Sequence, residues 1–153
     1  MKNISKFRDY SAFLLNGGMH VYSRLMNELA DAYVWLTAES AKVHAMIDHA
    51  NGERQMYELA DGWLDNDVEK SRDASIARIR GITINEPIID RLFEGNLPEQ
   101  ANAMRQLGRA YEILATHYAK LLVDNGFCGT MEASLDDADR WLNPKLRPAD
   151  CDK

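Results

Sequence analysis

An amphipathic stretch from residue 19 to residue 50 constrains the fold of this chain more than any other feature of the sequence. Its apolar side chains recur at the spacing of an α-helix, and neither glycine nor proline interrupts it. A helix of this length must bury its stripe against other helices. The stripe predicts one long helix over about 19–50, with these residues on its inner positions: Tyr22, Leu25, Leu29, Ala32, Leu36, Val43 and Met46.

A second long helix is predicted over about 97–125, between Pro98 and Gly126. Small residues occupy one column of its heptad pattern, and Gly108 costs a helix interior about 1 kcal/mol relative to alanine. Close approach of another helix, from the same chain or from a second copy, explains the glycine. The predicted packing face consists of Ala101, Met104, Leu107, Gly108, Tyr111, Leu114, Ala115 and Tyr118.

Shorter helical patterns flank the two long ones, at about 5–15, from residue 53, from residue 67 to 80, around 87–93 and around 131–142. Thr130 or Ser134 is expected to cap the last of them. The sequence therefore predicts an all-α fold, an elongated and mostly antiparallel helical bundle. We expect one helical domain over residues 1–142 and a flexible tail over 143–153.

Composition excludes several classes of function. The formal net charge of −6 disfavours direct binding of nucleic acid, which recruits lysine and arginine. No stretch approaches about 20 apolar residues, so no membrane span is expected. The two cysteines show no zinc-binding spacing and do not form a disulfide framework, which favours a cytoplasmic protein without a cofactor.

Among the features of the sequence, an internal repeat most resembles a catalytic or metal-binding site. The segment RLMNELAD over 24–31 and the segment RQMYELAD over 54–61 agree at six of eight positions. Glutamate and aspartate at i and i+3 lie on one side of a helix, so each copy could present two carboxylates to Mg²⁺. The candidate metal ligands are Glu28, Asp31, Glu58 and Asp61.

The segment ELADAYVWL over 28–36 resembles the second metal motif of the all-α nucleotide pyrophosphohydrolases of the MazG kind. The resemblance implies a Mg²⁺-dependent enzyme that hydrolyses nucleoside triphosphates. It covers about nine residues. That family also carries an earlier Glu-x-x-Glu motif, whereas Asp9 is the only acid before Glu28 in this chain.

Helix geometry separates the two carboxylate pairs within one chain. With a turn at Asn51-Gly52, Glu28 and Glu58 would lie roughly 26 Å apart along the helix axis. A symmetric dimer could still bring them together. The simpler interpretation is two solvated helix faces, because Arg24 and Arg54 each stand four residues before the glutamate of their segment. In that interpretation the leucines at 29 and 59 both point inward.

Glu39 and the histidines are the remaining polar candidates. Glu39 interrupts the inner stripe, where it could fix the helix register or contact a ligand, or else reach the edge and pair with Lys42. His44 and Asp48, at i and i+4, could bind a metal, although a hydrogen-bonded pair within the helix is the simpler expectation. His117 is predicted beside the buried stripe of the second long helix.

These patterns favour a non-enzymatic helical module that binds another protein as an adaptor, regulator or inhibitor, most plausibly as a homodimer. The first alternative is the Mg²⁺-dependent pyrophosphohydrolase. The second is an acidic inhibitor that mimics nucleic acid, since acids cluster over 53–73 and again over 132–139.

Overall fold

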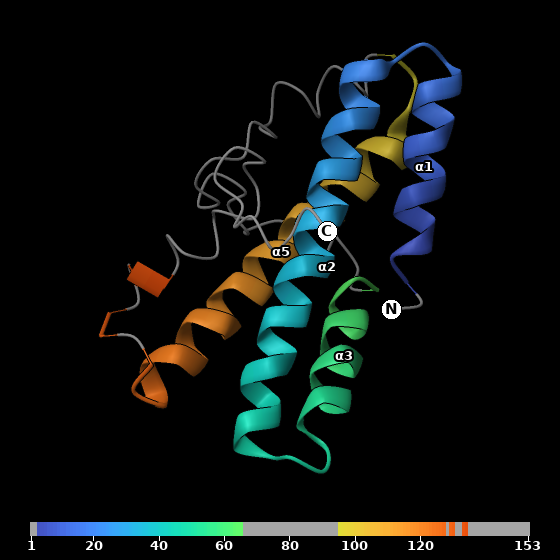
Figure 1. The fold of residues 1–153 in the computed structure, drawn as a ribbon. Helices are drawn as coiled ribbons and strands as arrows, with labels where there is room; N and C mark the ends of the chain where they lie inside the picture. The colour runs from blue at the N-terminus through green and yellow to red at the C-terminus, as the bar shows by residue number, and fades with distance from the viewer. Residues whose placement is uncertain (1–2, 66–94, 128, 131–132, 135–153) are drawn as a thin grey trace.

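The computed structural model describes residues 3–65, 95–127, 129–130 and 133–134, and this part of the chain is all-α (Figure 1). Its helices are α1 (Ser5–Asn16), α2 (His20–Ile47), α3 (Gly52–Trp63) and α5 (Pro98–Asp124). The two long helices, α2 and α5, are those that the apolar stripes predicted. The patterns at 67–80, at 87–93 and over most of 131–142, and the tail at 143–153, lie outside the described residues.

Glycines set the boundary between α1 and α2. Gly18 has a φ of +80°, a left-handed conformation that side chains disfavour, and it follows directly on the last turn of α1. The N–H of Met19 then donates to the carbonyl of Leu14 at 2.9 Å. The chain reverses within three residues, over the NGG sequence at 16–18.

α2 lies at the centre of the described helices, and α1, α3 and α5 all pack against it. Its side chains are buried on several sides rather than along one stripe, because each neighbour covers a different side. α1 and α3 each join α2 through a short turn, whereas α5 runs in the same general direction as α2 in Figure 1. The buried residues of α2 are Ser23, Met26, Leu29, Ala30, Ala32, Tyr33, Leu36, Thr37, Ser40, Ala41 and Val43.

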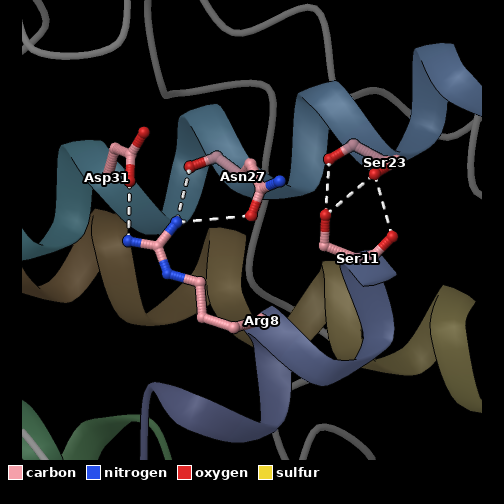
Figure 2. Close-up of polar contacts among 5 residues, drawn as sticks. All are labelled: Arg8, Ser11, Ser23, Asn27 and Asp31. Atoms are coloured by element: carbon pink, nitrogen blue, oxygen red, sulfur yellow. Dashed lines mark hydrogen bonds and ion pairs between the residues drawn. The ribbon is translucent and has the colours of Figure 1, made fainter. Parts of the chain in front are cut away.

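Polar contacts join α1 to α2 at two levels (Figure 2). The hydroxyl of Ser11 donates to the carbonyl of Ser23 at 2.9 Å, and the hydroxyl of Ser23 donates to the carbonyl of Ser11 at 2.8 Å. Both serines are buried, so these bonds satisfy groups that would otherwise be costly to remove from water. Further along, the Arg8 guanidinium contacts Asp31 at 2.6 Å and Asn27 at 3.3 Å.

A close backbone contact joins α2 to α3. A Cβ atom on Gly52, the first residue of α3, would overlap the carbonyl oxygen of His44 in the last turn of α2. Further along α3, the Tyr33 hydroxyl of α2 donates to the Ala60 carbonyl. The N–H of Asn3, which precedes α1, donates to the Asp61 carboxylate at 2.6 Å. Gly52 therefore begins α3 against α2, rather than ending α2 as its sequence position suggested.

The face of α5 predicted to pack against a helix is buried within the chain itself. All eight of its residues are buried, and the seven other than Gly108 belong to the same core cluster as Leu36 of α2. The all-α prediction is confirmed; the elongated, mostly antiparallel arrangement of the whole chain is not.

The contact between Gly52 and His44 yields a prediction about stability. Gly52→Ala should lower the free energy of unfolding by about 1–3 kcal/mol, because the new methyl group overlaps backbone that cannot move aside cheaply. Gly62→Ala in the same helix is the matched control. Nothing lies within 4 Å of a Cβ placed there, so it should change stability little or add up to about 1 kcal/mol. Urea unfolding measures both, and equal effects would show that the contact is not tight.

Candidate functional site

A hollow of about 480 Å³ runs along the outer side of α3. The described residues that line it all belong to this helix and stand at i, i+3, i+4, i+7 and i+8. They are Gln55, Glu58, Leu59, Gly62 and Trp63. We refer to these five residues as the α3 groove. It combines an exposed leucine, part of an indole and the bare backbone of a glycine, surrounded by polar side chains.

The orientation of α3 explains why the groove faces outward. The residues that α3 buries against the rest of the chain are Gly52, Met56 and Ala60, which follow one another at intervals of four. Because this row fixes the inner side of the helix, Leu59 is rotated away from the core and remains 42% exposed. The prediction that Leu59 points inward is wrong, whereas Leu29 at the matching position of the repeat is 2% exposed.

Two histidines meet where α2, α3 and α5 come together. The Nε2 atoms of His44 and His117 lie 2.9 Å apart. Their ring centroids are 5.2 Å apart, close to the largest separation that this contact allows, so the rings meet tip to tip. Trp63 of α3 lies edge-on to His117, with 5.4 Å between the ring centroids. Through His117, α5 contacts side chains of both α2 and α3.

Burial lowers the pKa of both histidines. Desolvation lowers the pKa of His44. Desolvation is also the largest cause for His117, whose pKa the positive charges of His44 and Lys120 lower further. Two neutral imidazoles can share one proton as an N–H···N hydrogen bond, whereas two imidazolium ions at this distance would repel each other. The close contact therefore favours the state in which both imidazoles are neutral.

No pattern in the sequence predicted this histidine pair, because its members stand 73 residues apart on different helices. The expected partner of His44 was Asp48. The Asp48 carboxylate instead accepts hydrogen bonds from the backbone N–H groups of Ala50 and Asn51, at 3.1 and 3.2 Å, and closes the turn after α2. A pairing between distant helices depends on their register, which no local pattern encodes.

The repeated carboxylates each have a local contact. Glu28 lies 3.9 Å from Arg24, and Glu58 lies 3.9 Å from Arg54, which are the helical pairs that the spacing predicted. Asp31 forms an ion pair with Arg8 at 2.6 Å.

Asp61, the fourth candidate ligand, accepts the backbone N–H of Asn3. Because α2 ends at Ile47, the turn lies earlier than expected, and the axial offset between the glutamates falls to about 20 Å. The described residues contain no group of three or more histidine, cysteine, aspartate or glutamate side chains that could hold a metal ion. Within this part of the chain, the four carboxylates are therefore not gathered into one group.

Glu39 has the simpler of the two roles considered for it. Its carboxylate accepts a hydrogen bond from the Lys42 ammonium group at 2.9 Å, and its side chain is 32% exposed. It reaches the edge of the core and pairs there, so the interruption of the stripe does not place a charge inside the protein.

Comparison with protein-family models, curated proteins and solved structures finds no match to this chain. Among the described helices, none is long and apolar enough to cross a membrane.

The placement of the carboxylates yields a prediction about catalysis. We expect no Mg²⁺-dependent release of pyrophosphate from canonical or modified nucleoside triphosphates, because the four candidate ligands do not meet. A coupled phosphate assay measures it. Turnover that disappears in both Glu28→Gln and Glu58→Gln, but persists in Glu53→Gln, would establish the enzyme instead.

The histidine pair yields a prediction about pH. Since burial lowers both pKa values in the folded state, the unfolded chain takes up protons first as pH falls. The contribution of the two neutral histidines to the stability of the folded state is fully present above about pH 6.5. It should be lost as pH falls through their lower pKa values in the folded state. Urea unfolding between pH 8 and pH 5 should show this decrease, and His117→Gln should reduce its slope. The exposed His49→Gln is the control, and equal slopes in all three proteins would contradict the prediction.

Proposed function

We propose that this chain is a non-enzymatic protein-binding module, an adaptor, regulator or inhibitor, and that its α3 groove binds an amphipathic helix of the partner protein. The observation that carries the proposal is the outward position of Leu59, Gly62 and Trp63 along a single helix. An apolar side chain that the fold leaves 42% exposed beside a hollow is available to a partner without any rearrangement of the core.

The spacing of the groove favours a helix as its ligand. Residues at i, i+3, i+4 and i+7 form the stripe with which one helix packs against another. Gly62 adds space in this stripe, because no atom lies within 4 Å of a Cβ placed there. A large apolar side chain of the partner can fill that space, flanked by Leu59 and Trp63, and such a central anchor carries most of the free energy of binding in many interfaces.

The charge around the groove favours a basic rim on the partner. α3 carries three acids, Glu53, Glu58 and Asp61, and one base, Arg54. The Glu58 side chain lines the groove and is 71% exposed, so lysine or arginine beside the partner's apolar stripe would meet it at the rim. Such rim pairs mainly accelerate association and select the partner. Binding should therefore weaken as salt is added.

The proposal includes three predictions from the sequence: an elongated, mostly antiparallel bundle, a cytoplasmic location and a homodimer. The small number of cysteines supports a cytoplasmic location of the protein. Three exposed apolar side chains near the turn between α1 and α2 support self-association at a place separate from the α3 groove. They are Phe13, Leu15 and Val21, which are 54%, 49% and 56% exposed.

Paired variants test the groove. Leu59→Asp places a charge in the groove, and Met46→Asp places the same charge at another exposed apolar position, on α2 and outside the groove. Both should change the free energy of unfolding by no more than about 0.5 kcal/mol, because neither side chain is buried. Proteins captured from the native host by the parent should be lost with Leu59→Asp and kept with Met46→Asp, as measured by quantitative mass spectrometry.

A second step separates specific capture from background. A peptide covering the amphipathic helix of the captured protein should bind the parent in solution, and should bind Leu59→Asp about tenfold or more weakly. Capture that survives Leu59→Asp, or that Met46→Asp removes instead, would show that the α3 groove is not the binding site.

A further inference from the structure

The contact between His44 and His117 goes beyond the proposed binding of a helix, because it joins α2 to α5 and does not line the α3 groove. We propose that these two histidines form a binding site for a divalent transition-metal ion such as Zn²⁺, which takes the place of the proton that the two rings share. The site would tie the C-terminal parts of the two long helices together.

The tip-to-tip geometry carries this proposal. With the Nε2 atoms 2.9 Å apart and the ring centroids 5.2 Å apart, each Nε2 atom is directed at the other. One of the two nitrogens donates the shared proton and the other accepts it. A Zn–N bond is about 2.0–2.1 Å long, so two imidazole nitrogens at the tetrahedral angle lie about 3.3 Å apart. The rings need to separate by about half an ångström and tilt to admit the ion.

The surroundings of the pair suit such an ion. Both imidazoles are only partly buried, so water can complete the coordination. Their pKa values are lowered by desolvation, which keeps both imidazoles neutral at neutral pH. Imidazole prefers zinc, copper and nickel to magnesium or calcium, which distinguishes this site from the carboxylates of the repeat. Lys120 is the cation whose field reaches His117, and because that lysine is exposed, solvent screens its charge.

Titration of the full chain with Zn²⁺ tests the proposal, and the protein must be free of any histidine tag. Isothermal titration calorimetry should show one ion bound per chain. His44→Gln and His117→Gln should each lower the affinity by about tenfold or more. His20→Gln and His49→Gln remove exposed histidines of the same chain and should leave the affinity unchanged.

Two further readouts guard against variants that merely fold poorly. The rise in melting temperature on adding Zn²⁺ is compared with each variant's own metal-free value, because an ion that binds only the folded state must stabilise it. Cu²⁺ should quench the fluorescence of Trp63, which lies 5.4 Å from the His117 ring, and the quenched amplitude should fall in Trp63→Phe.

The proposal is overturned if the parent binds no Zn²⁺, or if both His44→Gln and His117→Gln bind it as the parent does. Loss of binding in His49→Gln alone would also overturn it, by placing the ion elsewhere. Leu59→Asp should leave Zn²⁺ binding unchanged, so the metal site and the α3 groove can fail independently.

Discussion

Burial of α2 on several sides is the constraint on which the rest of the structure depends. Tyr33 and Leu36 have no exposed surface, although each is a large side chain on a helix of 28 residues. A helix that is apolar on one side needs one neighbour, whereas this one needs α1, α3 and α5 together. Its neighbours are consequently placed by α2, and both the α3 groove and the histidine pair lie where those neighbours meet or turn away from it.

Small residues decide how closely the neighbours approach. Gly52 lets the start of α3 touch the backbone of α2, and Ala60 continues that contact beside Tyr33, whose hydroxyl donates to the Ala60 carbonyl. Burial raises the pKa of Tyr33, with the charge of Asp61 adding to the effect, so this phenol remains a neutral donor. The close contact fixes the rotation of α3 about its own axis. That rotation turns Leu59 and Trp63 outward and creates the groove.

The sequence predicted what local patterns control. Gly17 and Gly18 ended α1, Pro98 began α5, and Thr130 accepts the backbone N–H of Ala133 at 3.1 Å, as an N-cap does. The sequence did not predict the features that depend on contacts between helices. Leu59 was misplaced because the inner row of α3 follows its small residues rather than its most apolar ones. The meeting of His44 and His117 depends on how far α5 slides along α2, and periodicity alone leaves that distance free.

The repeat shows how one motif acquires two roles. In α2 the segment around Leu29 and Ala30 is covered on both sides, so both residues are buried and the motif serves the core. At the matching two positions in α3, Ala60 is buried and Leu59 is exposed. The acids of both copies lie at the surface in contact with Arg24, Arg8, Arg54 and Asn3. What the two segments share is therefore a good amphipathic helix, and what differs is the number of neighbours. The copy with fewer neighbours is the one left with an exposed apolar side chain, and the proposed binding of a partner helix rests on that exposure.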